Sequence, residues 1–587
     1  RRAVSVHARQ DGGPWGVHAS GSVGPGSATA GEPLRVWPPR DATEMEVSGA
    51  YDQLAAAGYR YGPAFQGLRR AWRRGDEVFA EIALPEAARQ AGGAYLTHPA
   101  LLDAALHAVM LDALDATEPS LPFAWTGVRV HRRGDTDLRV RFAPVGPAAV
   151  SVTLADSAGN PVASADRLEW RPVAAAALGS ARRDSLYRLQ WTELSVGPAE
   201  DAPAGWADTV RVVELPSPSA PDVVTATHEA TARALALAHD WLDSGDERTL
   251  VVLTENAVPT AAGEANDLPL AAALGLLRTV ATENPGRVAL VDLDGSPGAR
   301  RLLAAVAAAG EPQAVVRDGR VLAPRLVRLE TADADGVRFD PAGTVLLTGG
   351  TGGLGAALAK RLVRHHGVRR LLLTSRRGPT AEGADALLAE LAELGATASV
   401  AACDVADRDE LAALLAAIPA EWPLRSVVHL AGVSDDGLIG SLSAERVSAV
   451  LRPKVDAVWN LHELTRDTEL SAFVLFSSAA SVFGAPGQGN YAAANAFLDA
   501  MVHHRRTRGQ TATTLSWGLW EGAGGITGHL TALDLRRMAR SGVAAIPVAE
   551  GLDLFDAALA QPRAWVLPLK LDRAALPAPD LAAATSG

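Results

Sequence analysis

Cysteine is almost absent from this sequence, since Cys403 is the only one in 587 residues. One cysteine excludes an intrachain disulfide framework and a cysteine-based zinc site, which fits a reducing cytoplasm. No uninterrupted apolar run of about 20 residues is present, so no segment is expected to cross a membrane. The net charge of -12 and the lack of any Lys/Arg-rich run argue against nucleic acid or an anionic membrane as partner. These absences favour a cytoplasmic enzyme.

Lysine is scarce as well, because nearly all basic residues are arginines and the only lysines are Lys360, Lys454 and Lys570. A retained lysine in such a chain points to a position that needs a compact ammonium rather than a planar guanidinium. Charge of either sign is missing from residues 476–497, "FSSAASVFGAPGQGNYAAANAF", which nevertheless hold several polar side chains and Tyr491. A buried tyrosine usually needs a hydrogen-bond partner, so Tyr491 is either a core aromatic or a reactive phenol in a dry pocket.

The chain is too long for one hydrophobic core and is expected to form several domains. Residues 1–172 are rich in short strands around one apolar helix near "HPALLDAALHAVMLDAL", which predicts an α+β domain with an antiparallel sheet. An Ala/Gly/Ser linker follows over 173–184. Residues 185–330 and 331–575 alternate strands with Ala-rich helices, which predicts two α/β units, each with a doubly wound parallel sheet. The tail, 576–587, is expected to be disordered.

Only the second α/β unit carries a glycine fingerprint. In "TVLLTGGTGGLGAALAKRL" an apolar strand runs into a turn with Gly349, Gly353 and Gly355 and then into a helix, the context that favours a dinucleotide over a mere tight turn. The next strand ends in Ser375 and Arg376, where an NAD site would place an acidic residue. A hydroxyl and a guanidinium suit a 2′-phosphate, so NADPH is the predicted cofactor. The alternative is a pair of solvated surface arginines.

Two further segments fit the same cofactor site. "ACDVAD" follows a strand and would set Asp404 and Val405 beside the adenine. "VVHLAGV" places the small residues Ala431 and Gly432 where backbone must approach the cofactor closely. Both segments therefore extend the predicted nucleotide site.

The spacing T-G-x-x-x-G-x-G, with Ser478 thirteen positions before Tyr491, resembles the short-chain dehydrogenase/reductase family. Most members carry a lysine four residues after the tyrosine, whereas here Asn495 stands there and Lys454 lies upstream. This exchange resembles the ketoreductase domains of modular polyketide synthases and animal-type fatty acid synthases. "SLYRLQW", "ENPGR", "TSRRG", "HLAGV" and "LSWGLWEG" extend the resemblance over about residues 185–571, and residues 185–330 resemble the ketoreductase structural subdomain, which binds no cofactor.

The resemblance implies NADPH-dependent reduction of a β-ketoacyl thioester held on the phosphopantetheine of an acyl carrier protein, beside other domains of the synthase and without a metal. Tyr491 would donate the proton, Ser478 would bind the carbonyl oxygen, Lys454 would lower the Tyr491 pKa and bond the nicotinamide ribose, and Asn495 would position Lys454 or a relay water. Taken singly, each residue fits a cap or packing role. The implied cofactor contacts are Thr348, Gly349, Thr351, Gly352, Gly353, Leu354, Gly355, Ser375, Arg376, Asp404, Val405, Ala431, Gly432, Lys454, Tyr491, Trp517 and Gly518.

The loop "GVSDDGLIG" resembles the Leu-Asp-Asp loop of B-type ketoreductases, which give the D-configured hydroxyl. Asp435 and Asp436 match that loop, whereas Ser434 replaces its leucine. Phe483 stands where A-type enzymes carry a diagnostic tryptophan, so Asp436 and Phe483 are expected to face the substrate in a B-type enzyme. An Asp-Asp-Gly triplet is also compatible with an ordinary turn.

"GYRYGPAFQGL", "HPALLDAALH" and "LPFAW" resemble the C-terminal half of a polyketide-synthase dehydratase, a double hot-dog fold. Asp103 matches the catalytic acid of that family, and His107, four residues later, is expected to contact substrate or to be a core residue. The family's base, a histidine in H-x-x-x-G-x-x-x-x-P, has no counterpart here, which leaves dehydration doubtful on this chain. A domain entered midway and a missing initiator Met suggest a fragment. Rival readings are a silent reductase module and a dehydratase (lyase).

Overall fold

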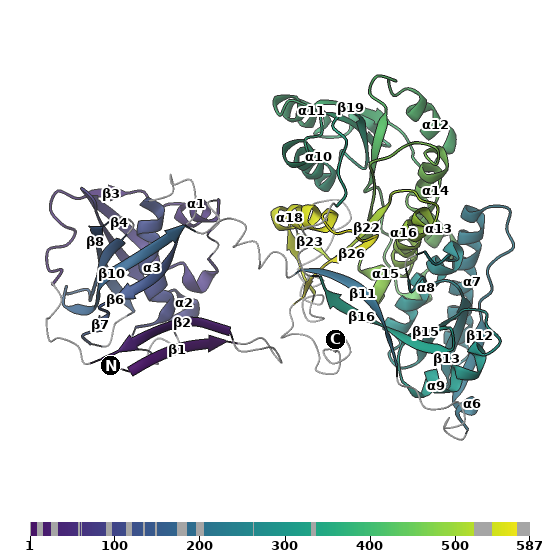
Figure 1. Cartoon of the computed structure of the whole chain (residues 1–587), viewed down its shortest axis with the longest axis horizontal. Helices are drawn as coiled ribbons and strands as arrows, with labels where there is room; N and C mark the ends of the chain where they lie inside the picture. Colours follow the sequence, from purple (N-terminus) through teal and green to yellow (C-terminus); the bar gives the residue numbers. More distant parts are fainter. Residues whose placement is uncertain are drawn as a thin grey trace. The chain divides into compact units, whose positions relative to one another are not determined.

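The structure is a computed structural model that describes residues 2–8, 16–24, 33–56, 59, 61–89, 95, 97–112, 120–132, 136–146, 149–172, 185–194, 205–261, 263–329, 336–521 and 543–571. It divides into two compact units, Arg1–Ser180 and Ala181–Gly587 (Figure 1). The predicted linker over residues 173–184 and the predicted tail over residues 576–587 lie outside the described residues.

The first unit is an antiparallel sheet that packs on one long helix. Helix α3 (Pro99–Asp112) begins at a proline, whose missing N–H is harmless in the first turn. Its buried residues Leu101 and Ala105 meet Ile82 and Val140 of the sheet in one core. The strands, in spatial order, are β3 (Thr43–Met45), β4 (Leu68–Arg74), β5 (Glu77–Ala83), β8 (Asp137–Gly146), β9 (Ala149–Ala155), β10 (Pro161–Pro172) and β6 (Ser120–Thr126). This architecture confirms the predicted antiparallel hot-dog region.

Smaller elements complete this unit. Strands β1 (Arg2–Ala8) and β2 (Gly16–Val23) pair as an antiparallel ribbon. Strand β7 (Arg129–Val130) pairs with β10. The short helices are α1 (Ala50–Ala56), η1 (Pro63–Phe65) and α2 (Glu86–Arg89).

The second unit is built on one sheet of thirteen strands rather than on two separate sheets. Strand β11 joins its two halves, because it pairs antiparallel with β16 on one side and with β26 on the other. The strands of the first half are β11 (Leu186–Glu193), β12 (Val210–Glu214), β13 (Thr249–Glu255), β14 (Val288–Leu293), β15 (Gln313–Arg317) and β16 (Arg320–Arg328). The two predicted doubly wound α/β units are thus confirmed as Rossmann-like regions, although the sheet is mixed where β16 pairs antiparallel with β15 and β11. The continuity of the two sheets is a feature that the strand pattern did not predict.

The second half of this sheet is wholly parallel, in the order β19-β18-β17-β20-β21-β22-β26. Chain order therefore reverses between β17 and β20, and this reversal marks the place where open α/β sheets bind ligands. The strands are β17 (Thr344–Thr348), β18 (Arg370–Ser375), β19 (Thr397–Ala402), β20 (Leu424–His429), β21 (Ala472–Ser478), β22 (Thr513–Trp517) and β26 (Trp565–Pro568).

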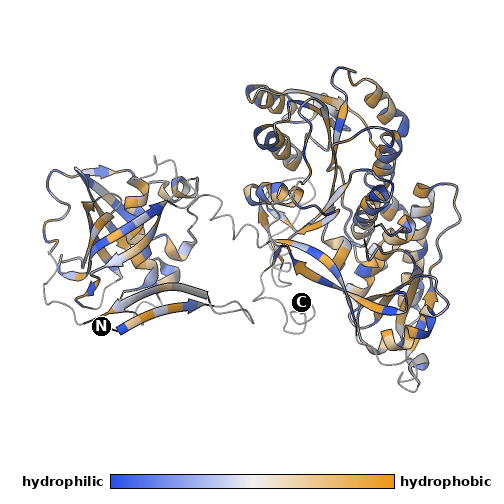
Figure 2. Cartoon of the chain, viewed as in Figure 1, coloured by the Kyte–Doolittle hydropathy of each residue, from blue (hydrophilic) through white to orange (hydrophobic). Residues whose placement is uncertain are grey.

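Helices cover both faces of this parallel half. Alternate residues of β17 enter different cores, with Leu346 on one face and Val345 and Leu347 on the other, which explains its uninterrupted apolar sequence. Figure 2 shows hydrophilic and hydrophobic residues on the same outer helices, as expected for amphipathic helices over a buried sheet. The helices are α10 (Gly353–His366), α11 (Ala384–Glu393), α12 (Arg408–Ala416), α13 (Ala444–Leu451), α14 (Val455–Leu464), α15 (Ala480–Phe483), α16 (Gly489–Arg506) and α18 (Val548–Leu559).

One helix of the first half of the second unit packs directly against a helix of the second half. Helix α8 (Leu268–Glu283) packs on α7 (Val223–Asp243) and on α16. Its approach to α16 requires Gly275, because a Cβ there would lie 2.6 Å from the carbonyl oxygen of Ala492. Helix α16 is therefore covered by a helix from the other half of the sheet. The remaining helices of this half are α6 (Trp206–Thr209), η4 (Ala299–Leu302) and α9 (Leu303–Ala308).

Candidate active site

The glycine-rich loop lies between β17 and α10 and is too tight for side chains at two positions. Gly349 has φ of 70°, in the left-handed region, and its N–H bonds the Thr374 carbonyl at 2.8 Å. A Cβ on Gly355 would overlap the Gly349 carbonyl oxygen. Gly352 caps α10 without a side chain, so the first N–H groups of the helix keep no side-chain partner there. Such a turn fits a pyrophosphate.

The residues predicted beside the adenosine end of the cofactor follow β18 and β19. The Ser375 hydroxyl accepts the Gly378 N–H at 3.1 Å, and Arg376 is exposed. The Asp404 carboxylate pairs with Arg452 at 2.5 Å, and its backbone N–H donates to Glu410 at 2.8 Å. Val405 is buried. The structure therefore brings these residues to the same edge of the sheet as the glycine loop.

The ends of β17 and β20 touch beside this loop. The Thr348 hydroxyl contacts His429 Nδ1 at 2.8 Å and accepts the Ala431 N–H at 3.4 Å. A Cβ on Gly349 would lie 3.1 Å from the Ala431 nitrogen, so the glycine loop closely approaches the backbone that precedes the predicted cofactor residues Ala431 and Gly432. Burial, and then the charge of Lys454, lower the pKa of His429 to about 3. Sequence reasoning missed this neutral histidine, and its place directly before the "LAG" segment was the available signal.

Lys454 reaches the site from the loop before α14. Its side chain is buried, and its Nζ donates to the Phe476 carbonyl at 2.9 Å and lies 5.9 Å from the centroid of the Tyr491 ring. Burial lowers the pKa of Lys454 to about 8, against an opposing effect of Asp499. The fold therefore brings the retained lysine beside Tyr491, although the two are distant in sequence.

Ser478 ends β21, and Tyr491 lies in the first turn of α16. Burial raises the pKa of the Tyr491 phenol, while hydrogen bonds with Asn495 and Ser478 act in the opposite direction. The net shift is opposite to the lowering expected from Lys454, because desolvation is the largest influence on the phenol. The phenol is consequently a protonated group at neutral pH.

Asn495 lies one helical turn after Tyr491 and is fully buried. Its Nδ2 donates to the Tyr491 carbonyl at 2.8 Å, and its Oδ1 has no partner among the described residues. Neither contact reaches Lys454, which was one of the two partners predicted for Asn495; the other was a relay water. An unpaired buried acceptor next to the phenol is a place for a water or ligand donor.

Asp499, one turn beyond Asn495, was not singled out from the sequence. It is buried, and its carboxylate accepts three hydroxyl groups, from Ser481 at 2.5 Å and from Thr514 and Ser516 at 2.9 Å each. Burial raises its pKa to about 6, against these hydrogen bonds. It ties α16 to β22 and α15. A lone acidic residue in the otherwise uncharged first four turns of α16 was its sequence signal.

The loop after β20 lies against the loop before α16. The Asp435 carboxylate pairs with Arg446 at 2.6 Å, and its carbonyl accepts the Asn490 side chain at 2.7 Å. The Asp436 carboxylate accepts the Gln488 side chain at 3.0 Å. Phe483 is 45% exposed. Asp436 therefore lies on a loop that bonds the residues around the start of α16, and Phe483 ends α15 a few residues before them.

Trp517 is placed differently from the other predicted cofactor residues. Its indole is buried, stacks on Phe476 with ring centroids 5.5 Å apart and contacts Trp520. The Gly518 N–H donates to the Pro568 carbonyl at 2.9 Å. The Trp517 side chain thus belongs to the core beneath the sheet edge, which leaves only its backbone for contact with a cofactor.

The two predicted residues of the first unit form a pair on α3. His107 Nε2 lies 3.3 Å from the Asp103 carboxylate, and its Nδ1 lies 3.2 Å from the Tyr51 hydroxyl. The Tyr61 ring lies over the imidazole, with centroids 4.0 Å apart. His107 is fully buried, whereas the Asp103 side chain is 36% exposed. These contacts favour the alternative of a core histidine over substrate contact, and they leave Asp103 accessible.

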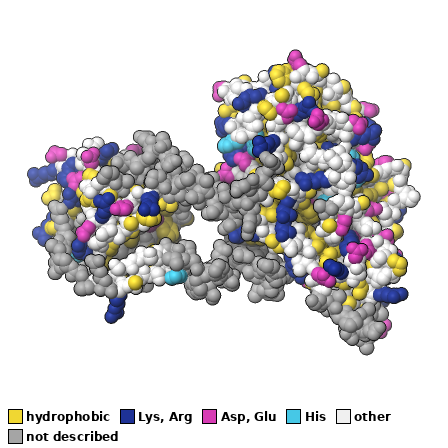
Figure 3. Space-filling view, in the orientation of Figure 1, with side chains coloured by type: hydrophobic (Ala, Val, Ile, Leu, Met, Phe, Trp, Pro, Cys, Tyr) yellow, Lys and Arg dark blue, Asp and Glu magenta, His cyan; other side chains and the backbone are white. Residues whose placement is uncertain are grey.

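Among the described residues, the other features that could indicate a site are clusters of charge, metal-binding groups and membrane-spanning helices. On the face drawn in Figure 3, acidic and basic side chains are interspersed. Within the described ranges, no cluster of three or more His, Cys, Asp or Glu could hold a metal ion. No helix in the part of the chain that the structure describes is long and apolar enough to span a bilayer.

The strand order, the glycine loop and the meeting of Ser478, Tyr491 and Lys454 are those of a short-chain dehydrogenase/reductase. Family models agree and are more specific. Residues 343–522 match the KR domain, residues 168–326 match the Rossmann fold domain of polyketide synthase extender module SpnB, and residues 29–180 match the polyketide synthase dehydratase N-terminal domain.

Solved structures place the second unit in one family. "Structure of A-type Ketoreductases from Modular Polyketide Synthase" is 34% identical with a TM-score of 0.60, and the match covers 67% of this chain and 94% of that one. "The first ketoreductase of the tylosin PKS" is 32% identical with a TM-score of 0.57, over 67% and 94%. The chain belongs to the ketoreductases of modular polyketide synthases, an enzyme family, with a dehydratase region ahead of the reductase.

Curated relatives are much longer proteins. Polyketide synthase GfsA of Streptomyces halstedii is 48% identical over 98% of this chain, which spans 8% of that protein. Spectinabilin polyketide synthase system protein NorA' of Streptomyces orinoci is 44% identical over 98% of this chain, which spans 18% of it. The chain thus corresponds to a small part of each relative.

Proposed function

We propose that this chain reduces the ketone of a β-ketoacyl thioester carried by an acyl carrier protein, with NADPH as reductant, to the β-hydroxyacyl thioester. The observation that carries the proposal is the position of Lys454, one of three lysines in the chain, beside Tyr491 at the carboxyl edge of the parallel sheet. Membership of a modular synthase supports the carrier protein and the neighbouring synthase domains as partners.

The residues at the sheet edge fit a nicotinamide dinucleotide. The loop that excludes a Cβ at Gly355 leaves room for a pyrophosphate at the N-terminus of α10, and the exposed Arg376 next to Ser375 suits a 2′-phosphate, which favours NADPH. When bound, the cofactor supplies the hydride. The remaining contacts proposed for it are Thr348, Gly349, Thr351, Gly352, Gly353, Leu354, Asp404, Val405, Ala431, Gly432, Lys454, Tyr491 and the backbone of Trp517 and Gly518.

The protein's own contribution is orientation and a proton. The Ser478 hydroxyl would donate to the ketone oxygen and hold it against the phenol of Tyr491, which gives up its proton as negative charge develops on that oxygen. The raised pKa of Tyr491 supports this role, because the phenol is protonated when the substrate binds. The Lys454 ammonium would stabilise the resulting phenolate, and the unpaired Oδ1 of Asn495 would hold a water for reprotonation.

We also propose the D-configured, B-type outcome. It is supported by Asp435 and Asp436 in the loop after β20 and by Phe483, rather than tryptophan, at the exposed position before α16. Similar solved structures include ketoreductases whose titles describe them as A-type, so this part of the proposal depends on these three residues alone.

For the first unit we propose, from the motifs around Asp103, the C-terminal half of a dehydratase over residues 1–172, although the family model that matches residues 29–180 is described as the dehydratase N-terminal domain. A linker over 173–184, a structural subdomain over 185–330 and a catalytic subdomain over 331–575 would follow. Asp103 would be the acid of the intact dehydratase, since it remains accessible. No H-x-x-x-G-x-x-x-x-P motif occurs in this sequence, and His107 is already paired on both nitrogens, so dehydration by this chain alone is not proposed. The single cysteine supports a cytoplasmic setting.

The test mixes the purified chain with NADPH and a β-ketoacyl N-acetylcysteamine thioester and follows absorbance at 340 nm. We expect NADPH consumption that Tyr491→Phe abolishes and a β-hydroxyacyl product. A rate no higher than that of Tyr491→Phe would show a silent module. Formation of an enoyl thioester from the β-hydroxyacyl thioester would instead favour the lyase.

A further inference from the structure

The last residue of helix α8 is a glutamate, and its carboxylate binds two loops that belong to the other half of the second unit. Glu283 is its last residue, and its two carboxylate oxygens accept different backbone N–H groups: those of Ile439 at 3.1 Å and of Gly487 at 2.8 Å. Residues 435–439 follow β20, and residues 484–490 precede and begin α16. We call the first half of the sheet with its helices (residues 185–330) the structural half and the second (residues 331–575) the catalytic half. One side chain of the structural half therefore bridges two loops of the catalytic half.

These two loops also bond each other. The Gly437 N–H donates to the Gly487 carbonyl at 2.7 Å, and the Gln488 side chain donates to the Asp436 carboxylate at 3.0 Å. Asp436 lies on one loop, while Tyr491 follows directly after the other. These two hydrogen bonds between the loops thus fix the position of Asp436, the residue expected to face the substrate, relative to Tyr491, the proposed proton donor.

The same end of α8 holds the chain around Phe483 by its backbone. Arg278 donates to the Ser481 carbonyl at 2.6 Å, Thr282 donates to the Phe483 carbonyl at 3.0 Å, and the Thr279 hydroxyl accepts the Ala485 N–H at 3.3 Å. The Phe483 ring stays exposed, because these bonds all reach its backbone or that of its neighbours.

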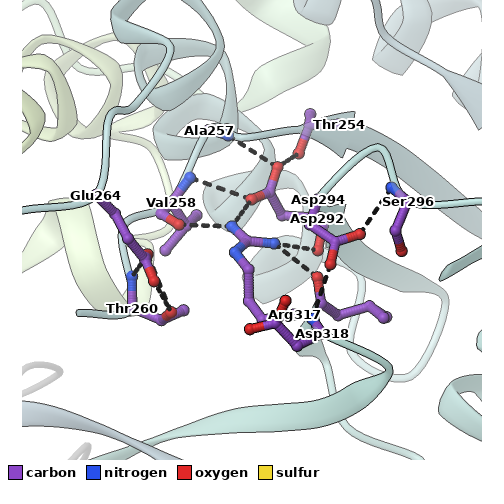
Figure 4. Close-up of polar contacts among 11 residues, drawn as sticks. Thr254, Ala257, Val258, Thr260, Glu264, Asp292, Asp294, Ser296, Arg317 and Asp318 are labelled. Carbon is purple, nitrogen blue, oxygen red and sulfur yellow. Dashed lines mark hydrogen bonds and ion pairs between the residues drawn. The ribbon is translucent and has the colours of Figure 1, made fainter.

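The other end of α8 is anchored in the structural half. The Asp267 side chain caps the helix by accepting the Leu270 N–H at 2.8 Å. The segment before the helix is held from β14, where the buried Asp292 carboxylate accepts the Ala257 N–H at 2.9 Å and pairs with Arg317, which donates to the Val258 carbonyl at 2.6 Å (Figure 4). Helix α8 is therefore anchored at both ends, and this anchoring fixes the position of Glu283.

We propose that Glu283 is a positioning residue that sets the gap between the 435–439 and 484–490 loops and thereby the ketone face presented to Tyr491. This inference rests on the proposed reduction. A carboxylate is suited to the task because each oxygen accepts one N–H, whereas an amide would keep one acceptor and turn a donor toward the other N–H. Loss of both bonds would leave two partly buried N–H groups unpaired and free the loops to separate.

The experiment compares Glu283→Ala and Glu283→Gln with Glu264→Gln in the whole chain. Glu264 is the matched control, because its carboxylate also accepts a backbone N–H and a hydroxyl, both from Thr260 at 2.6 and 3.0 Å, but touches no catalytic loop (Figure 4). We expect Glu283→Ala to reduce the ratio of D to L product about tenfold and to raise the KM for the thioester, with an unchanged Kd for NADPH. Glu283→Gln should give a smaller change in the same direction, and Glu264→Gln none.

Hydrogen–deuterium exchange gives a readout that needs no turnover. Amides of residues 437–441 and 485–489 should exchange faster in Glu283→Ala than in the wild type, and at the wild-type rate in Glu264→Gln. Unchanged exchange, or a product ratio that changes no more than in Glu264→Gln, would overturn the inference. A wild type that bonds these loops as described but consumes no NADPH would instead overturn the proposed function.

Discussion

The two halves of the thirteen-stranded sheet follow the same strand-helix alternation, yet the helix that follows the first parallel strand begins differently in each half. In the structural half, Asp222 caps α7 by accepting the Thr225 N–H at 2.9 Å, and Asp267 caps α8 in the same way. In the catalytic half, α10 begins at Gly352 with no side-chain cap. A capped helix end has used its N–H groups and carries a carboxylate that repels phosphate, whereas an uncapped one can accept an anion. The proposed cofactor site thus coincides with a helix end that no side chain caps.

The largest effect is expected for a substitution of Tyr491, the proposed proton donor. Tyr491→Phe should lower kcat about 1,000-fold, because it removes the group proposed to protonate the ketone oxygen, while NADPH binding and the melting temperature stay close to the wild type. The matched change in the structural half, Tyr187→Phe, removes a hydroxyl from a buried tyrosine on β11 and should keep full activity. Steady-state kinetics of both variants measure this, and equal losses would contradict a division of labour between the halves.

The halves also differ in how they bury a carboxylate. Asp292 pairs with Arg317, whereas Asp499 is held by three hydroxyl groups. Burial raises the pKa of Asp499 from 3.8 to about 6, so the folded state binds this proton more tightly than the unfolded state. The stability gained from that proton is full below pH 3.8 and is lost as the pH rises through 6.

Asp499→Asn should therefore be insensitive to this titration. Between pH 4 and pH 7, the unfolding free energy of the wild type should fall relative to that of Asp499→Asn by on the order of 3 kcal/mol. Chemical denaturation across that pH range measures the difference. Parallel curves for the two proteins would show that Asp499 does not titrate there.

Selectivity for the cofactor sharpens the comparison within the catalytic half. Arg376→Ala should raise the Kd for NADPH about tenfold and leave the Kd for NADH unchanged, since only the 2′-phosphate would lose a charge-assisted bond. Its neighbour Arg377 is exposed as well and serves as the control, with a smaller expected effect. Fluorescence titration with both cofactors gives the four constants, and an equal loss for NADH would mean that Arg376 does not bind the 2′-phosphate.

The smallest effect is expected at the cap of the structural half. Asp222→Ala should destabilise the protein by about 1 kcal/mol through loss of the cap on α7. The Kd for NADPH should not change, because the turn before α7 contains no glycine and so lacks the close backbone approach of the turn before α10. Thermal melts and cofactor titration measure both quantities. If Asp222→Ala gained nucleotide affinity in the structural half, the cap on α7 alone would be what prevents this half from binding a cofactor.

Much of the catalytic half was predictable because its signals are local. The strand, the glycine turn and α10 lie within a short segment, and Ser478 and Tyr491 lie close enough in sequence for spacing to indicate a joint role. Fold class and family followed from these segments. The roles of the individual residues stay predictions that the experiments above address.

What could not be predicted depends on distant pairing. The Lys454 ammonium is turned to the Phe476 carbonyl, and the Trp517 indole enters the core; neither placement has a signature in the neighbouring sequence. Glu283 reads as an ordinary helix-end charge until Ile439 and Gly487 are brought to it by the fold. Asp499 needed its three hydroxyl partners, which come from α15 and β22, to be recognised.

The position of strand β11 affects how the reductase folds during its synthesis and which boundaries an excised fragment of it needs. Leu186, near the start of the second unit, pairs with Pro568, close to the end of the described chain. The sheet cannot be completed during synthesis until that late strand has left the ribosome, so an early segment waits unpaired while most of the unit is translated. An excised reductase would need both strands, and a cut that spares every catalytic residue but removes residues 186–193 would leave an open edge at the middle of its sheet.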